Sequence, residues 1–415
     1  MSGLLLVRGA RQLLTLRGPA GARRGPALGE LGIIEDGAVL IRQGVIVSVG
    51  PARRVENLRE AREADVIEAA GRVVMPGLVD CHAHFVPGRV LRIPQHPPGR
   101  PLLAAHASQW SAAFRSTSRS RTLWECRRWL HQLLRHGTTA VEIKAGWGLE
   151  TATELKLMRV LAHLRDGPVD LVSTYSVREP QGGPAREPAA YLEFLLAQLF
   201  PVLVRRRLAR FIEMPSELGG CDGERLYRCL AGATALGFPV KVHAVAHAQP
   251  EAVAMAVNLG AASVEALTSF TASMIASLAA SPVIVTLLPA LCLAGEDPGA
   301  AAVRELIRSG AAVALATGYG DTPTFSVPTA IAMACLFWEL APAEAITAAT
   351  VNAACALGLQ SRLGSLEPGK QADLVIFDVP DYREIPYHLG VNLVKAVVKR
   401  GEPVYRCGEI LCSED

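Results

Sequence analysis

The sequence predicts a TIM-like (β/α)8 barrel combined with a small β-sandwich domain built from both chain ends. Between residues 71 and 365, short apolar runs alternate with helical stretches, which is typical of parallel β/α architecture. Both ends instead contain β-branched runs punctuated by glycine, such as residues 37–50 and 372–378. A length of 415 residues accommodates a barrel and a second domain.

The domain organisation follows from these patterns. We expect residues 1–70 and 366–415 to form the composite β domain and residues 71–365 to form the barrel. The first 29 residues contain arginines and no acid, which superficially resembles a transit peptide, but apolar runs at 4–7 and 13–16 favour paired β-strands. A doubly wound sheet is the alternative to the barrel, yet no Gly-X-Gly-X-X-Gly stands at a strand–helix turn.

The barrel elements can be placed in order along the chain. The turn pair Pro76-Gly77 precedes a first strand that ends at His82 and His84. Apolar periodicity predicts helices over residues 151–165 and about 250–259. Later strands are expected at residues 138–143, 169–175, 239–244, 262–265, 283–289 and 312–317.

Composition and charge exclude several classes of partner. The net charge is only +3, so we expect no nucleic acid partner. No apolar run approaches the roughly 20 residues of a membrane span, so no membrane partner is expected. Nine cysteines occur without a Cys-X-X-Cys pair, which indicates a reducing, cytoplasmic location. A small-molecule substrate remains the expected partner.

Three histidines form a candidate metal site. His82 and His84 are two residues apart, so in a strand their side chains point to the same face. His243 ends a later strand, and the carboxyl ends of barrel strands meet at one face. Three imidazoles with an open fourth position can hold a divalent ion. The alternative is that these histidines are pocket residues without a metal.

Two carboxylates are candidate catalytic bases. Glu265 ends the strand that follows His243, and Asp321 follows the last strand. A carboxylate near a metal can take the proton of an attacking water molecule. For Glu265, an equally plausible role is a carboxylate paired with a nearby lysine or arginine.

Three segments carry a resemblance to a known family: residues 146–160, 363–375 and 385–392. With the histidines above, they make the chain similar to the metal-dependent amidohydrolase superfamily and, within it, to the imidazolonepropionase family. That family opens the imidazolone ring in histidine breakdown. The resemblance implies one divalent metal ion, zinc or iron, and a homodimer.

The resemblance also assigns roles to individual residues. His82, His84 and His243 match the metal-binding histidines of the family, and Trp147 stands at the position of its pocket tyrosine. Arg89 corresponds to the arginine that grips the substrate carboxylate.

Two family positions are changed. Gly318 stands where the family has its metal-binding aspartate, and Ala246 where it has a glutamate. Asp321, three residues after Gly318, reaches the site only if the loop is rebuilt. Two hypotheses follow: a hydrolase acting on a C–N bond of a small cyclic amide, or an inactive descendant that serves as a binding or assembly scaffold. The retained histidines favour the first hypothesis, and the replaced residues favour the second.

Overall fold

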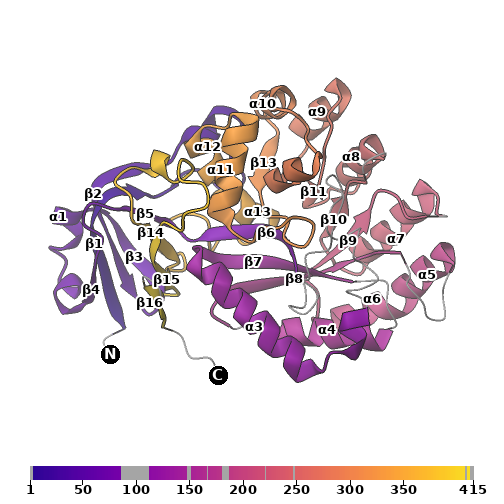
Figure 1. The fold of residues 1–415 in the computed structure, drawn as a ribbon, viewed down its shortest axis with the longest axis horizontal. Helices are drawn as coiled ribbons and strands as arrows, with labels where there is room; N and C mark the ends of the chain where they lie inside the picture. The colour runs from indigo at the N-terminus through magenta and orange to yellow at the C-terminus, as the bar shows by residue number, and fades with distance from the viewer. Residues whose placement is uncertain are drawn as a thin grey trace.

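The computed structural model describes residues 3–85, 112–146, 151–165, 167–179, 187–219, 221–245, 248–406 and 409–411. Its larger unit is a sheet of eight parallel strands whose order follows the chain from β6 to β13 (Figure 1). The strands are β6 (Leu78–His84), β7 (Thr138–Ala145), β8 (Asp170–Ser176), β9 (Phe211–Pro215), β10 (Val240–His243), β11 (Ser263–Glu265), β12 (Ile284–Leu287) and β13 (Ala312–Leu315). This is the predicted (β/α)8 barrel.

The barrel is closed by the segment that follows β13. The Gly318 N–H donates to the His82 carbonyl at 3.0 Å, and the His84 N–H donates to the Tyr319 carbonyl at 2.7 Å. Gly318 has a φ of 66°, a left-handed conformation that suits glycine. The last loop of the barrel is therefore fixed against the strand that carries His82 and His84.

Helices cover the barrel strands on the outside (Figure 1). Helix α3 shows why they form: the Ser118 side chain caps its start by accepting from the Arg121 N–H, and its inner face buries Leu130, Leu133 and Leu134. The helices after β6 are α3 (Arg119–Arg135), α4 (Thr151–His163), α5 (Pro188–Phe194), α6 (Phe200–Arg205), α7 (Gly223–Ala235), α8 (Gln249–Asn258), α9 (Ala272–Ala279), α10 (Ala300–Arg308), α11 (Val327–Trp338), α12 (Pro342–Thr347) and α13 (Ala353–Ala356).

One helical run, Pro188–Arg205, is long and apolar enough to cross a membrane by length and composition. It comprises α5, a π-helical turn and α6, and it connects β8 to β9 in the barrel. Leu195, Leu199 and Leu203 along it are buried in the core. In this fold the run serves as one of the helices that cover the barrel.

Both chain ends form the second sheet, as predicted. Its order is β17-β16-β15-β14-β5-β1-β2-β3, with β4 pairing with β1, and the antiparallel β5–β14 pair joins the two ends. The strands are β1 (Leu4–Leu14), β2 (Ile33–Arg42), β3 (Val45–Pro51), β4 (Asp65–Glu68), β5 (Val73–Pro76), β14 (Leu374–Phe377), β15 (Val394–Lys399), β16 (Glu402–Arg406) and β17 (Glu409–Ile410), and the short helix α1 (Ala52–Val55) follows β3. The change from this sheet to the barrel falls between Pro76 and Leu78.

The predicted pairing of residues 4–7 with 13–16 is wrong. Both runs belong to one strand, β1, which pairs with β2 and has an irregularity between Val7 and Ala10. Gly9 lies there with a φ of 70°. A glycine inside a strand can mark a bulge as well as a turn, and here it marks a bulge.

Asp170, at the start of β8, links the barrel to the second sheet. Its carboxylate accepts hydrogen bonds from Lys399 Nζ at 2.7 Å and Gln371 Nε2 at 2.7 Å, and it pairs with Arg400. Burial alone raises the pKa of Asp170, but the charge and hydrogen bond of Lys399, with those of Arg400 and Gln371, lower it to about 2. The ionised form of Asp170 is therefore stabilised by folding.

We expect Asp170→Asn to lower the free energy of unfolding by about 2 kcal/mol at neutral pH, since a pKa decrease from about 4 to 2 corresponds to that energy. Because the folded pKa is depressed, this stabilisation is present above about pH 4 and is lost as the pH falls through about 2. Urea unfolding at both ends of this range tests the effect. The exposed Asp378→Asn is the matched control, and equal losses in both variants would contradict the prediction.

Candidate metal centre

The predicted histidines converge at one end of the barrel. His82 and His84 lie at the end of β6, and His243 lies at the end of β10. The ring centroids of His82 and His84 are 5.3 Å apart, and those of His82 and His243 are 5.8 Å apart. All three imidazoles therefore share one small volume at the carboxyl ends of the strands, where barrel enzymes place their chemistry.

Asp321 joins these histidines. Its Oδ2 lies 3.5 Å from His84 Nε2 and 4.0 Å from His82 Nε2. The donor atoms of His82, His84 and Asp321 all lie within 4.8 Å of one another, and so do those of His82, Glu213 and His243. Nitrogen and carboxylate donors at such spacing suit a divalent transition metal.

The loop after β13 carries Asp321 into the site. Gly318 and Gly320 have φ values of 66° and 104°, and the Asp321 N–H donates to the Gly318 carbonyl at 3.0 Å. A Cβ at Gly320 would lie 2.7 Å from the Cβ of His84, so the loop passes too close to His84 for a larger residue. The turn thus brings the carboxylate back to the histidines from a position three residues beyond Gly318.

Two buried nitrogen atoms of this cluster are suited to bind a cation. His82 Nε2 and His243 Nδ1 are buried and have no hydrogen-bond partner among the described residues. Leaving a buried polar atom unpaired costs about 1–3 kcal/mol, so such atoms require an explanation. Burial lowers the pKa of His82 to about 3 and lowers the pKa values of His84 and His243. The imidazoles are therefore neutral at pH 7, which is the form that binds metal.

Glu265 lies beneath the histidines and is fully buried. Its Oε2 accepts from His82 Nδ1 at 2.6 Å and from Lys144 Nζ at 2.6 Å. Its Oε1 accepts from Lys241 Nζ at 3.0 Å and from the Ser263 hydroxyl at 2.6 Å. This contact with Nδ1 leaves His82 Nε2 to face the other donors, an arrangement that commonly orients metal-binding histidines.

A network of buried charges continues across the barrel interior. Lys144 pairs with Glu213, which also accepts from the Ser176 hydroxyl at 2.6 Å. Lys241 donates to Glu142 at 2.7 Å. Although burial raises the pKa of Glu265, the charges of Lys144 and Lys241, with His82, hold it well below its ordinary value. Sequence reasoning missed Glu213 and Lys241; the signal was a single charged residue within an otherwise apolar strand.

Replacing Glu265 tests its role. We expect Glu265→Gln to lower the free energy of unfolding by about 3–5 kcal/mol, because it removes the carboxylate that pairs with both Lys144 and Lys241 inside the barrel. Ser263→Ala, which removes only one hydrogen bond to Glu265, is the control, with an expected cost of about 0.5–1.5 kcal/mol. Chemical denaturation measures both. Unchanged stability combined with lost turnover would instead favour Glu265 as the catalytic base.

Arg178 is a third residue that sequence reasoning missed. It follows β8 closely, and its Nη2 lies 3.4 Å from His84 Nε2. The side chain is partly buried, so its charge faces the site. Arg89 and Trp147, which the resemblance places near substrate, lie outside the described residues, and so does Ala246 at the position of the family glutamate.

The fold and the site together define a class of protein. Residues 73–404 match the model of the amidohydrolase family, so the chain belongs to that family. It is similar in structure, at low sequence identity, to an adenosine deaminase from Xanthomonas campestris with bound zinc (TM-score 0.72, 20% identity, covering 98% of this chain and 94% of the other). It is likewise similar to E. coli guanine deaminase (TM-score 0.72, 17% identity, covering 98% and 99%). These two likenesses support the barrel fold.

Relatives found by sequence show to which branch of the amidohydrolase family the chain belongs. The imidazolonepropionase of Chloroflexus aggregans is 37% identical over 423 residues, which cover 96% of this chain and 98% of the relative. The imidazolonepropionase of Geobacillus kaustophilus is 37% identical over 424 residues, which cover 98% and 99%. Within the amidohydrolases, the chain therefore belongs to the imidazolonepropionase family. These relatives give no support to the hypothesis of an inactive scaffold.

Proposed function

We propose that the chain hydrolyses a C–N bond of a small cyclic amide, with imidazolonepropionate as the substrate, in histidine degradation. One observation carries the proposal: His82, His84, His243 and Asp321 converge at the mouth of the barrel and include two buried, unpaired nitrogen atoms. The names of the relatives indicate the substrate.

The same four residues would hold one divalent ion, zinc or iron. When bound there, such an ion supplies Lewis-acid activation of water and of the substrate carbonyl. The chain contributes the neutral imidazoles, with His82 oriented by the hydrogen bond from its Nδ1 to Glu265. We assign Glu265 a positioning role, because four donors surround its two oxygen atoms and no part of it is exposed.

Asp321 is the proposed general base. Burial raises its pKa, but the hydrogen bond with His84 and the positive charge of Arg178 lower the pKa well below the ordinary value. Its carboxylate is therefore ionised at neutral pH and available to accept a proton from the attacking water. The water oxygen bonds to the carbonyl carbon, the C–N bond breaks, and Asp321 returns the proton to the leaving nitrogen.

Arg178 is proposed to bind the carboxylate of the substrate. We expect Arg178→Met to raise KM about 10- to 100-fold with a smaller change in kcat, since a charge-assisted hydrogen bond contributes about 1.5–3 kcal/mol. Steady-state kinetics with imidazolonepropionate measure both constants. The KM of Arg178→Lys is expected to lie between those of wild type and Arg178→Met. A decrease in kcat at unchanged KM would contradict this role and would indicate that Arg178 acts through His84.

The proposal is tested by substrate choice. We expect imidazolonepropionate to be hydrolysed with a higher kcat/KM than hydantoin, a cyclic amide that lacks the carboxylate arm. Equal kcat/KM values would show that the site does not recognise the carboxylate arm. If the metal-loaded chain hydrolyses neither compound, the proposal is rejected.

We also propose a cytoplasmic location and a homodimer. The seven described cysteines are all free thiols, which suits a reducing compartment. In the segment 385–392, Tyr387, Leu389 and Val391 are 83%, 49% and 59% exposed, and such an apolar patch suits a contact between subunits. Light scattering on the purified chain measures the oligomeric state, and a monomer would contradict the second proposal.

A further inference from the structure

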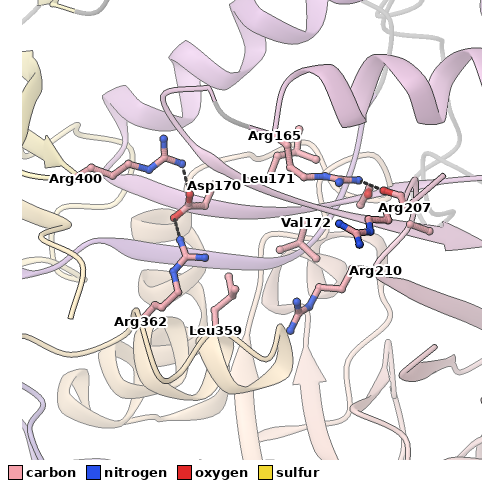
Figure 2. Close-up of a pocket in the computed structure, with 11 residues that line it drawn as sticks. Arg165, Asp170, Leu171, Val172, Arg207, Arg210, Leu359, Arg362 and Arg400 are labelled. Atoms are coloured by element: carbon pink, nitrogen blue, oxygen red, sulfur yellow. Dashed lines mark hydrogen bonds and ion pairs between the residues drawn. The ribbon is translucent and has the colours of Figure 1, made fainter. Parts of the chain in front are cut away.

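An open hollow of about 330 Å³ lies at the start of β8, at the end of the barrel opposite to the metal centre. Figure 2 shows residues that line it. Residues Asp170 to Ser173, at the start of β8, form one wall. Ser176, which contacts Glu213 of the buried network, ends the same strand, so at about 3.3 Å per residue Asp170 lies roughly 20 Å and Ser173 roughly 10 Å from that end. Its ligand chemistry is therefore independent of the proposed hydrolysis.

Five guanidinium groups surround this arginine hollow. They come from four parts of the chain: the end of α4, the segment before β9, the segment after α13, and the turn between β15 and β16. Figure 2 shows the five side chains around the cavity: Arg165, Arg207, Arg210, Arg362 and Arg400. Like charges that converge in this way repel one another, and a bound anion would offset that repulsion.

The acidic group in the hollow cannot supply that compensation. Asp170 is the one carboxylate among the described residues that line it. Asp170 is already paired with Lys399 at 2.7 Å, with Arg400, and with Arg362 at 3.6 Å. Arg165, Arg207 and Arg210 therefore have no ion-pair partner among the described residues.

Two of these three arginines, Arg165 and Arg210, are fixed by the backbone. Arg165 Nη2 donates to the Arg207 carbonyl at 2.5 Å. Arg210 donates through Nε to the Leu357 carbonyl and through Nη2 to the Gly358 carbonyl, both at 3.1 Å. Burial lowers the pKa of Arg210, and the charge of Arg362 lowers it further. The protein thus holds guanidinium groups in place while their charges remain unneutralised, which is a preorganised arrangement for an anion.

We propose that the arginine hollow binds the phosphate group of a small metabolite, such as a nucleoside monophosphate. The planar fork of a guanidinium matches the oxygens of phosphate, and several forks from different directions suit a tetrahedral dianion. The volume lies at the lower end of the range for small-molecule sites, so it holds more than a bare phosphate group. Because Arg400 comes from the second sheet and Arg207 from the barrel, the ligand would link the two units.

Calorimetric titration of the full metal-loaded chain with AMP, in phosphate-free buffer at low salt, tests the proposal. We expect saturable binding that raises the midpoint of thermal unfolding, because a ligand of the folded state stabilises it. Arg207→Ala should weaken the binding at least about tenfold, the usual effect of losing a charge-assisted hydrogen bond. Arg362→Ala, on a different element, should weaken it as well.

The control variant is Arg59→Ala/Arg62→Ala, which removes two exposed arginines from the small domain and should leave binding unchanged. Adenosine, which lacks the phosphate, should not bind. Tighter binding of AMP than of inorganic phosphate would identify a phosphate ester as the ligand, whereas equal affinities would identify free phosphate. Absence of AMP binding tighter than about 1 mM would overturn the proposal. So would equal affinity in Arg207→Ala and wild type, or equal binding of adenosine.

Discussion

Asp321→Asn is expected to lower kcat for imidazolonepropionate about 10²- to 10⁴-fold, the usual contribution of a general base. The amide keeps the shape of the side chain but cannot accept the proton of the attacking water. It is also a weaker metal donor, so metal affinity should fall as well. Stability should fall as well, because the folded state lowers the pKa of Asp321 and therefore favours its ionised form.

The matched control is Asp36→Asn, an exposed aspartate in a left-handed turn conformation that asparagine also adopts readily. Steady-state kinetics and metal analysis are carried out on both variants. A kcat of Asp321→Asn within about twofold of wild type, at equal metal content, would show that Asp321 is not the general base. Glu265 would then be the remaining candidate.

His243→Ala is expected to reduce bound metal from one ion per chain to near zero, and turnover to background. His243 is the better ligand to delete, because its unpaired Nδ1 makes no hydrogen bond among the described residues that the substitution would break. His82, by contrast, is bonded to Glu265. Without metal, the variant should therefore unfold at nearly the same denaturant concentration as wild type.

Added zinc should distinguish wild type from His243→Ala by its effect on the free energy of unfolding. At about 100 times its dissociation constant, a ligand of the folded state adds about 2.7 kcal/mol to the free energy of unfolding, so wild type should gain stability and His243→Ala should not. His163→Ala, on the exposed face of α4, is the control. An equal gain in His243→Ala would show that His243 is not a ligand.

The fold was largely predictable because its signals are local. Strand–helix alternation is set by apolar periodicity, and it correctly placed the ends of β6 and β10, where His82, His84 and His243 lie. The N-terminal error at Gly9 was also local, because a bulge and a turn can use the same residue. Neighbouring residues alone could not decide between them.

The site was less predictable because its contacts join distant strands. Nothing near Glu265 in sequence shows that Lys144 and Lys241 meet it inside the barrel. The inward position of Asp321 depends on the backbone angles of Gly318 and Gly320, which sequence pattern does not specify. From the sequence alone, Gly318 at the position of the family aspartate suggested that a ligand was lost. In the structure, the Asp321 carboxylate reaches the histidines from the turn that follows.

The most direct test of the account is a titration of the metal-stripped chain with Zn²⁺ or Fe²⁺ while hydrolysis of imidazolonepropionate is recorded. We expect no turnover without metal, and a rise in turnover that is complete at one bound ion per chain. Full turnover by the metal-free chain, or no turnover with one ion bound, would contradict the assignment of His82, His84, His243 and Asp321 as the centre of a metal-dependent hydrolase.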